Sequence, residues 1–332
     1  MKFIPPSDMA ARLCIAPRTL RDRAAVDKLK PEGQREFIRD RRGFYGVDDV
    51  REQPAKAPDP VTFAEPIRSQ PGNTPPSPGQ ESRNASVTGD VEKWILIPDV
   101  HVPYHDKRAF GLMCRAAKAI GATRCVQMGD LADCYSVSKY PKDPKRRSSA
   151  EWELAEVNKA LDVLDRVFPD ERWITLGNHD VRMVKYLATN APAVAGMFSL
   201  DEMLRFRERG WRVTQYLDSA ELGDLEVTHE QGWSGKTAAA NAVASSFESQ
   251  ANAHTHFLTF HAVGGGDVRT RVGAQFGWLG SYEFIDYAHR KKIMRSHAHG
   301  FGIAYVVPGG RTHVVPVVIM DGCVVVEGKV VR

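Results

Sequence analysis

From about Val91 onward, short apolar runs alternate with longer segments in which apolar residues recur at helical spacing. The longest helical segment opens with Ser148 and Glu151 at the spacing of a capping box. This β-α-β-α-β order indicates an α/β layer architecture. The predicted elements are a strand at 93–100, a helix at 109–120, a strand at 124–130, a helix at 148–168 and a strand at 173–178.

The pattern changes near the C-terminus, where helical spacing gives way to short apolar strands. Pro308-Gly309-Gly310 and Asp321-Gly322 separate these strands, and both are typical of tight turns. The segment therefore predicts antiparallel hairpins. The predicted strands lie within 302–307, 313–320 and 323–331.

Upstream of Val91 the composition defines two further parts. Residues 1–50 contain short helical patterns, whereas residues 51–90 hold eight of the chain's 20 prolines and few large apolar side chains. Such a segment cannot bury enough apolar surface to offset its ordering entropy, which is typical of a disordered linker. We therefore expect a small module at 1–50, a proline-rich linker at 51–90 and the main domain at 91–332.

Cysteine usage and the absence of long apolar runs bear on the compartment. The five cysteines are scattered and form no Cys-x-x-Cys pair, which favours a reducing compartment and argues against a thiolate metal site. The first residues lack an apolar core of signal-peptide length, and no later run approaches the roughly 20 apolar residues of a membrane span. We expect a cytoplasmic protein that does not enter a membrane.

Polar side chains follow each of the three predicted strands, and two later segments add histidines. Functional residues of open α/β sheets gather at the carboxyl ends of strands, which is where these residues fall. Taken singly, each is explained as a helix cap or as a polar group near a strand end, but together they indicate one shared site. The groups are Asp99-x-His101, Asp130 with Asp133, Asn178-His179-Asp180, His229 and His254-x-His256.

The chemistry that these residues share is metal binding. Carboxylate, imidazole and amide oxygen without thiolate suit Mn, Fe, Zn or Ni better than a dedicated Ca or Mg cage, and we expect Mn first. Seven ligands are too many for one tetrahedral ion and suit two divalent ions about 3.5–4 Å apart that share a carboxylate. The candidate ligands are Asp99, His101, Asp130, Asn178, His229, His254 and His256.

The combined motif set resembles the calcineurin-like metallophosphoesterase superfamily over residues 93–332. The stretches "PDVHVPYHD", "THEQGWSGK" and "HGFGIAYV" are similar to the phosphoesterases of bacteriophages and prophages. The resemblance implies a four-layer α/β/β/α sandwich, a dinuclear site at the strand ends, and a bacterial or phage-infected bacterial cell as its location.

The resemblance also implies a role for each site residue. A hydroxide held between the ions attacks phosphorus. His179 faces the phosphate as general acid or charge stabiliser, Asp133 orients its ring, and Asp180 anchors the turn. The ligands it implies are Asp99, His101 and His256 for one ion, Asn178, His229 and His254 for the other, and Asp130 as the bridge.

Four positions depart from patterns within the superfamily. Ala253 stands where Gly usually precedes the final His-x-His, and Glu230 stands where Gly commonly follows the lone His. Cys134 occupies the position of an Arg in protein Ser/Thr phosphatases, and Asp133 that of a His in break-repair nucleases. The last two differences argue against those subfamilies, while the first two leave an inert domain open.

The N-terminal stretch "SDMAARLCIAPRTLRDRAA" resembles a helix-turn-helix, and "FIRDRRGFYGV" after it predicts a basic hairpin or wing. Residues 1–42 hold 11 Lys and Arg against six Asp and Glu, an excess of five where the whole chain has +4. This asymmetry indicates nucleic-acid binding, with Arg18, Arg21 and Arg23 exposed on the recognition helix. The alternative is a small helical module for dimerisation or protein docking.

Together these features predict a dinuclear metal-dependent phosphoesterase that acts on phosphodiester bonds in nucleic acid. Two alternatives stay open: a phosphomonoesterase or nucleotide phosphatase, and an inert phosphoesterase-fold adaptor that binds DNA. A second His-x-His, His297 and His299, is interpreted as structural or substrate-facing. The basic run from Lys142 to Arg147 is interpreted as a solvated loop, with phosphate-backbone contact as the alternative.

Overall fold

The structure is a computed structural model that describes residues 2–4, 45–47, 90–143, 146, 149–265, 268–284 and 296–332. The chain divides into two units, Met1–Asn84 and Ala85–Arg332. In the first unit the described residues form an antiparallel pair of short strands, β1 (Lys2–Ile4) and β2 (Tyr45–Val47). The predicted helix-turn-helix with Arg18, Arg21 and Arg23, and the predicted proline-rich linker, lie outside the described residues.

A six-stranded mixed sheet forms the centre of the second unit. β3, β4, β5 and β6 run parallel, β12 pairs antiparallel with β3, and β13 pairs antiparallel with β12 at the edge. The three strands expected from the apolar runs are confirmed, and they are neighbours, so their carboxyl ends share one edge. In sheet order the strands are β13 (Arg311–Val318), β12 (Gly300–Val307), β3 (Glu92–Ile97), β4 (Arg124–Gln127), β5 (Glu171–Thr175) and β6 (Trp211–Thr214).

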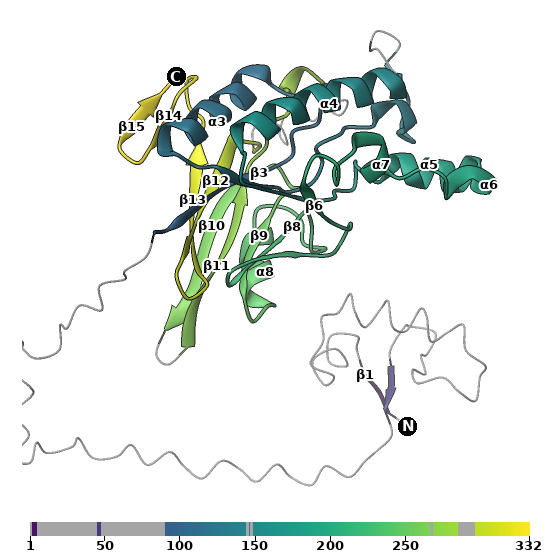
Figure 1. The fold of residues 1–332 in the computed structure, drawn as a ribbon. Coiled ribbons are helices and arrows are strands. Elements are labelled where there is room, and N and C mark those ends of the chain that lie inside the picture. The colour runs from purple at the N-terminus through teal and green to yellow at the C-terminus, as the bar shows by residue number, and fades with distance from the viewer. Residues whose placement is uncertain are drawn as a thin grey trace, which may run out of the picture. The chain divides into compact units, whose positions relative to one another are not determined.

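Two long helices, α3 (Lys107–Ile120) and α4 (Ala150–Val167), cover one face of this sheet (Figure 1). The Asp106 carboxylate accepts from the amides of Arg108 and Ala109 in the first turn of α3 at 2.9 Å, and Gly121 ends the helix in the left-handed region. The predicted capping box of α4 is wrong by one residue. Ser149, whose backbone is extended, is the cap and accepts from Trp152 N at 3.4 Å.

A five-stranded sheet packs against the opposite face of the first. Trp94, Leu96, Val126 and Met128 of the first sheet share a buried cluster with side chains of the second, whereas alternate residues of the same strands pack beneath α3 and α4. Its strands, in sheet order, are β10 (Leu258–Gly265), β11 (Val268–Phe276), β9 (Ser249–Asn252), β8 (Leu225–Thr228) and β7 (Ala220–Leu222).

The short helix α8 (Ala238–Ala244) lies on the outer face of this second sheet. On β11, Ala274 and Phe276 point into the cluster between the sheets, and a side chain at Gly273 on the other face would collide with Ala239 of α8. The layer order is therefore helix, sheet, sheet, helix, and the predicted α/β class is confirmed.

The C-terminal strands form the expected hairpins. β12 and β13 pair antiparallel across the Pro-Gly-Gly turn, and Met320 pairs with Cys323 across Asp321-Gly322. A last hairpin joins β14 (Val324–Val326) to β15 (Lys329–Val331) and packs against α3.

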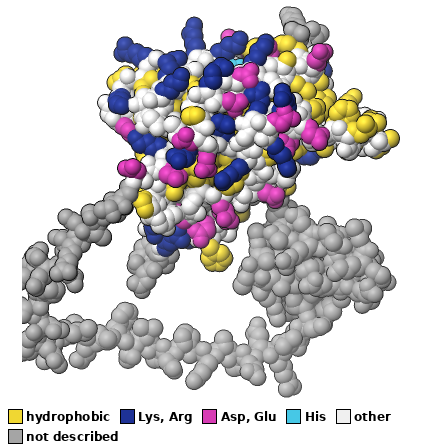
Figure 2. Space-filling model, viewed as in Figure 1, with side chains coloured by type: hydrophobic (Ala, Val, Ile, Leu, Met, Phe, Trp, Pro, Cys, Tyr) yellow, Lys and Arg dark blue, Asp and Glu magenta, His cyan; other side chains and the backbone are white. Residues whose placement is uncertain are grey.

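Three short helices follow β5: α5 (Arg182–Asn190), α6 (Pro192–Ala195) and α7 (Leu200–Leu204). Two 3-10 turns, η2 (Tyr135–Val137) and η3 (Tyr282–Phe284), complete the elements. α5 and α6 project from the body, and hydrophobic side chains gather on this projection (Figures 1 and 2). Within the described ranges, none of the helices combines the length and apolarity that a membrane crossing requires.

Candidate metal centre

Polar side chains from both sheets meet at one edge of the layered structure. β3, β4 and β5 end at Ile97, Gln127 and Thr175, and the loops after them carry the Asp99, Asp130 and Asn178 groups. In the second sheet, β8 leads into His229 and β9 leads into the His254 group. Because β8 and β9 are parallel neighbours, their ends also share an edge. The structure therefore brings together all seven candidate ligands.

Direct contacts join the two edges. The amide of His254 donates to both oxygens of the Asp99 carboxylate at 3.1 Å, although 155 residues separate them along the chain. His229 Nδ1 donates to the carbonyl of Met128, at the end of β4, at 2.9 Å. The packing of the two sheets thus fixes the relative positions of the donor groups.

The backbone at the site is held in an uncommon conformation. Five of the candidate ligands lie at positive φ, a region that costs a non-glycine residue roughly 1–3 kcal/mol. Such residues persist only where the surroundings determine them, and here they turn successive side chains toward one centre. The φ values are 22° for Asp99, 57° for His101, 53° for Asp130, 66° for His254 and 60° for His256.

The buried Asp180 carboxylate ties two of the site's loops together. It accepts from the amides of Asp130, Ala132 and Gly177 at 2.7–2.9 Å, which confirms the prediction that Asp180 anchors the turn. Burial and the negative charge of Asp130 raise the pKa of Asp180 to about 6. A side chain at Gly177 would collide with Asp130, so the two loops approach this closely only because residue 177 is glycine.

The first cluster of donor atoms consists of Asp99, His101 and His256. His101 Nε2 lies 3.3 Å from His256 Nε2, which lies 3.5 Å from Asp99 Oδ1. Burial opposes the charge on Asp99, but the hydrogen bond and charge of His256, together with the charge of His229, outweigh it and keep the pKa of Asp99 below its usual value. One ligand atom from each of the three residues lies within 4.8 Å of the others, close enough to hold one cation.

The second cluster consists of Asp130, His229 and His254, joined by the amide oxygen of Asn178. Asp130 Oδ2 lies 3.3 Å from His229 Nε2, and Asn178 Oδ1 lies 3.0 Å from His229 Nε2 and 2.8 Å from His254 Nδ1. Asp130 Oδ2 also lies 4.0 Å from His101 Nε2 of the first cluster. Asp130 therefore stands between the two clusters.

The charge of Asp130 dominates the electrostatics of the second cluster. Burial opposes this charge, but His179, His229 and His101 outweigh burial and hold the pKa of Asp130 well below its usual value. Burial likewise lowers the pKa of His229, but Asp130 outweighs it and raises that pKa to about 10. The protonated ring compensates the carboxylate, and a divalent cation would displace that proton.

Hydrogen-bond acceptors behind three of the imidazoles decide which nitrogen faces the clusters. Asp133 Oδ1 lies 3.0 Å from His101 Nδ1, the Met128 carbonyl accepts from His229 Nδ1, and Glu230 Oε2 lies 3.4 Å from His254 Nε2. In each ring the opposite nitrogen points into a cluster. Metal-binding histidines typically have such an acceptor on the other ring nitrogen.

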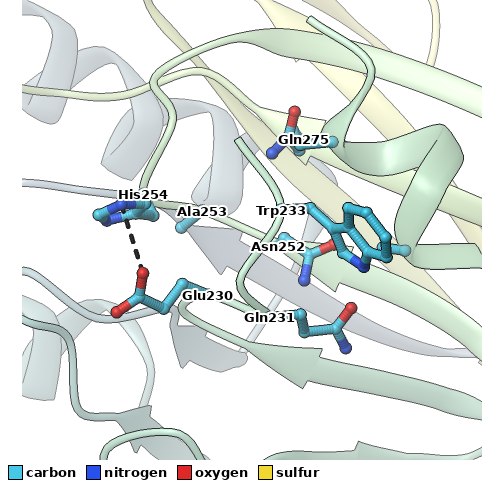
Figure 3. A pocket seen from close by; sticks show the side chains of 9 residues that line it. Glu230, Gln231, Trp233, Asn252, Ala253, His254 and Gln275 are labelled. Atoms are coloured by element: carbon cyan, nitrogen blue, oxygen red, sulfur yellow. Dashed lines mark ion pairs between the residues drawn. The ribbon is translucent and has the colours of Figure 1, made fainter. Parts of the chain in front are cut away.

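Glu230, which departs from the family pattern, therefore faces His254 as an acceptor. Its second carboxylate oxygen accepts from the Tyr216 hydroxyl, which fixes the carboxylate. Figure 3 shows Glu230 opposite His254 beside a small pocket that Gln231, Trp233, Asn252 and Gln275 also line. The sequence did not indicate this contact, because Glu230 and His254 lie in the loops after two different strands, β8 and β9.

Asp133 orients two rings. Its Oδ1 lies 2.9 Å from His179 Nδ1, as expected, and 3.0 Å from His101 Nδ1, which the sequence did not indicate. Burial opposes the charge, but the two hydrogen bonds outweigh it and hold the pKa of Asp133 far below its usual range. One carboxylate thus links the first donor cluster to His179.

His179 lies beside the donor clusters, with its ring edge-on to His101 at 4.5 Å. Its Nε2 is 3.8 Å from Asp130 Oδ2, so His101, Asp130 and His179 also form a group that could hold a cation. Arg182 NH2 lies 2.7 Å from the same Nε2. Because a guanidinium only donates, His179 Nε2 accepts this hydrogen bond through its lone pair.

For Arg146 the interpretation of the basic run as a solvated loop is wrong, while Lys145 and Arg147 of the same run lie outside the described residues. Its side chain is 7% exposed, and its guanidinium lies 3.6 Å from the ring centre of Tyr104 and 3.9 Å from that of Tyr135. Its NH2 is 3.7 Å from Asp133 Oδ2, and its NH1 donates to the Phe284 carbonyl. The aromatic residues that enclose it come from separate segments, so the basic run alone could not reveal this burial.

The second His-x-His does not join the donor clusters. The ring of His297 lies edge-on to His256 at 4.8 Å, and His299 Nε2 donates to the Gly280 carbonyl at 2.8 Å. Trp278 stacks on His256 at 4.7 Å. These rings form a wall behind the first cluster, which agrees with the structural interpretation of His297 and His299.

The donor chemistry of the site fits divalent metal ions. Carboxylate oxygens, imidazole nitrogens and an amide oxygen converge from buried or half-buried residues, and none of the donors is a thiolate. Three buried carboxylates in one place also require compensating positive charge. The clusters are therefore candidate sites for divalent metals, with a donor set that does not distinguish Mn, Fe, Zn and Ni.

Comparison with known proteins adds little. Neither a protein-family model nor a curated protein matches the chain. Among solved structures, the chain is similar to YfcE, described as a phosphoesterase from E. coli, with 14% identity and a TM-score of 0.35, over 67% of this chain and 98% of YfcE. So distant a likeness supports neither a fold nor an activity for this chain.

We expect Asp130→Asn to remove metal from both clusters, because Asp130 stands between them and supplies their shared negative charge. Metal analysis after reconstitution with Mn should fall from about two ions per chain to less than one. Asp218→Asn, at an exposed carboxylate, is the matched control and should keep the full content. Full metal content in the Asp130 variant would contradict the central position of this residue.

We expect Glu230→Gln to weaken metal binding by about tenfold, since an acceptor behind a metal-binding histidine typically contributes 10- to 100-fold. Calorimetric titration of the metal-free chain with Mn measures the affinity directly. Glu221→Gln, an exposed glutamate on β7, should leave it unchanged. An unaltered affinity in the Glu230 variant would mean that the contact with His254 does not orient the ring.

Proposed function

We propose that the chain is a dinuclear metal-dependent phosphoesterase that hydrolyses phosphoester bonds. The observation that carries the proposal is the division of the donor atoms into two clusters on either side of Asp130. Two cations that share a carboxylate in this way suit in-line phosphoryl displacement. In this proposal Asp99, His101 and His256 hold one ion, Asn178, His229 and His254 hold the other, and Asp130 is shared.

The layer order supports the corresponding fold assignment, a four-layer α/β/β/α metallophosphoesterase sandwich. In such a sandwich the loops from two sheets form one site, and here both sheets contribute donors through His254, His229 and Asp99. The donors thus depend on the packing between the sheets and not on one loop.

Bound cations would supply Lewis acidity toward the phosphate and lower the pKa of water at the site. The protein's own part is to hold the reacting groups in place. Asp133 accepts a hydrogen bond from His179 Nδ1, which leaves Nε2, 3.8 Å from Asp130 Oδ2, as the nitrogen that faces the site. As general acid, His179 would have to acquire a proton on Nε2 and release its hydrogen bond from Arg182; as a charge stabiliser it would act through the imidazolium.

Mn is the metal we propose first, with Fe, Zn and Ni as alternatives, because the donor set is mixed oxygen and nitrogen. The complete donor set and the acceptors behind His101, His229 and His254 favour an active enzyme over an inert adaptor, since neither is needed for a purely structural domain.

For the substrate we propose a phosphodiester in nucleic acid, with a phosphomonoester or nucleotide as the alternative. The basic excess of residues 1–42 supports nucleic acid, because Lys and Arg contacts to phosphates supply most non-specific affinity. In this proposal the N-terminal module binds DNA through Arg18, Arg21 and Arg23, and the protein works in the bacterial cytoplasm.

An activity screen of the full chain tests the proposal. The Mn-loaded protein is offered a nitrophenyl monoester, a nitrophenyl diester, nucleotides and labelled DNA. We expect hydrolysis that a chelator abolishes and Mn restores. His179→Ala should retain the metals yet lose roughly 10²–10⁴ in rate, the usual contribution of an acid–base group.

The second His-x-His provides the control, because His299→Ala lies outside the donor clusters and should keep most of the rate. Loss of metal in His179→Ala would make His179 a ligand instead. Absence of hydrolysis of every substrate at full metal content would reject the enzyme and favour the adaptor.

The N-terminal module is tested by shortening the chain to begin at Val91. We expect unchanged hydrolysis of the small diester, because every described donor lies beyond residue 91, but weaker binding of duplex DNA. The lost affinity should be its salt-sensitive part, since phosphate contacts act through counterion release. The measurement is the DNA affinity of the full-length and shortened chains at two salt concentrations. Equal affinities of the two chains would favour a docking or dimerisation role for the N-terminal module.

A further inference from the structure

Arg182 is a positively charged side chain at the metal centre whose described contacts involve no carboxylate. It is the first residue of α5, and its guanidinium contacts His179 Nε2 at 2.7 Å and the Asp133 carbonyl at 3.0 Å. Among the residues that the structure describes, no Asp or Glu forms an ion pair with it. Arg209 and Arg172, by contrast, are both paired with Asp165.

The guanidinium and the Asp130 carboxylate approach the same ring nitrogen. His179 Nε2 lies 3.8 Å from Asp130 Oδ2 and 2.7 Å from Arg182 NH2. A phosphate group placed beside His179 Nε2 would therefore lie close to the Arg182 guanidinium. The arginine is half-buried, so its charge is screened less than that of a surface side chain.

The hydrogen bonds decide which of the two side chains can donate to an anion. Asp133 accepts from His179 Nδ1, which leaves a lone pair on Nε2, and a lone pair does not bind a phosphate oxygen. Arg182 has five N–H groups, of which two donate to His179 Nε2 and to the Asp133 carbonyl. The remaining N–H groups make Arg182 the available donor beside His179.

We propose that Arg182 binds a non-bridging oxygen of the substrate's phosphate group. Guanidinium and phosphate form strong, charge-assisted hydrogen bonds, often two at once, which suits a residue that must hold and orient an anion. Arg182 is then a catalytic residue in contact with the substrate, and Asp133 fixes both His179 and, through its carbonyl, the arginine. The assignment rests on the proposed phosphoesterase function.

Binding of inorganic phosphate tests the assignment without relying on turnover. The full-length, Mn-loaded chain is titrated with phosphate by calorimetry and compared with Arg182→Gln, Arg182→Lys and Lys185→Gln. Lys185 lies on the same helix, but its ammonium sits over the Tyr216 ring, so its substitution removes the same charge without changing the contacts of Arg182 with His179 and Asp133. Metal content is measured for every protein.

We expect Arg182→Gln to weaken phosphate binding about 10- to 100-fold at full metal content, the range for a hydrogen bond to a charged group. Arg182→Lys should recover part of the affinity, because it restores the charge but not the fork of donors. Lys185→Gln should bind like the unchanged chain. The Michaelis constant for the diester should be highest in Arg182→Gln, intermediate in Arg182→Lys and unchanged in Lys185→Gln.

Equal phosphate affinity in Arg182→Gln and the unchanged chain would overturn the assignment and leave Arg182 as a brace for His179. If Arg182→Gln loses metal or does not fold, Arg182→Lys decides, since affinity equal to that of the unchanged chain would also contradict a role for the guanidinium fork. Arg182-dependent phosphate binding without hydrolysis of any substrate would reject the enzyme but retain the anion site. Hydrolysis by the unchanged chain, combined with unaltered phosphate binding in Arg182→Gln, would retain the enzyme but reject the anion site at Arg182.

Discussion

The carboxylate of Asp130 is buried where the ends of the two sheets meet, and its charge has to be compensated there. A buried carboxylate without partners is costly, so the surrounding segments must bring positive charge or hydrogen-bond donors to it. His229 supplies the nearest imidazole at 3.3 Å, and His179 donates its amide to Asp130 at 2.8 Å. Asp99 and Asp133 add two more buried charges nearby. The arrangement of the histidines follows from this concentration of negative charge.

Hydrogen-bond acceptors behind the metal-binding histidines orient the imidazole rings. Asp133, the Met128 carbonyl and Glu230 each face one nitrogen of a histidine, which leaves the other nitrogen to face a cluster. Two of these acceptors, Met128 and Asp133, lie in the loop after β4, and Glu230 lies in the loop after β8. Such an outer layer orients metal-binding side chains and raises their basicity. The geometry of the site therefore depends on the acceptors behind the histidines as well as on the donor atoms themselves.

The backbone of the donor residues is strained, because bringing their side chains together requires unfavourable φ values. Five donor residues occupy the left-handed region, and the loops that hold them are joined by Asp180, which receives three amides from two loops. Without that anchor and the glycine at 177, the Asp130 and Asn178 loops could not approach each other. Strained backbone at a site is maintained only when the rest of the fold over-determines it, and the two packed sheets provide that support.

The sequence alone determined the residue types of the site and their place at strand ends, because strand periodicity is local and the chemistry of a donor set follows from composition. It predicted the three parallel strands, the C-terminal hairpins and the anchoring role of Asp180, but it misplaced the cap of α4 and the environment of Arg146. Only the tertiary structure decided that Asp133 serves two rings, that Glu230 faces His254 and that Asp99 accepts from the His254 amide. The last of these contacts joins residues 155 positions apart, and its geometry depends on how the two sheets pack, which no local pattern encodes.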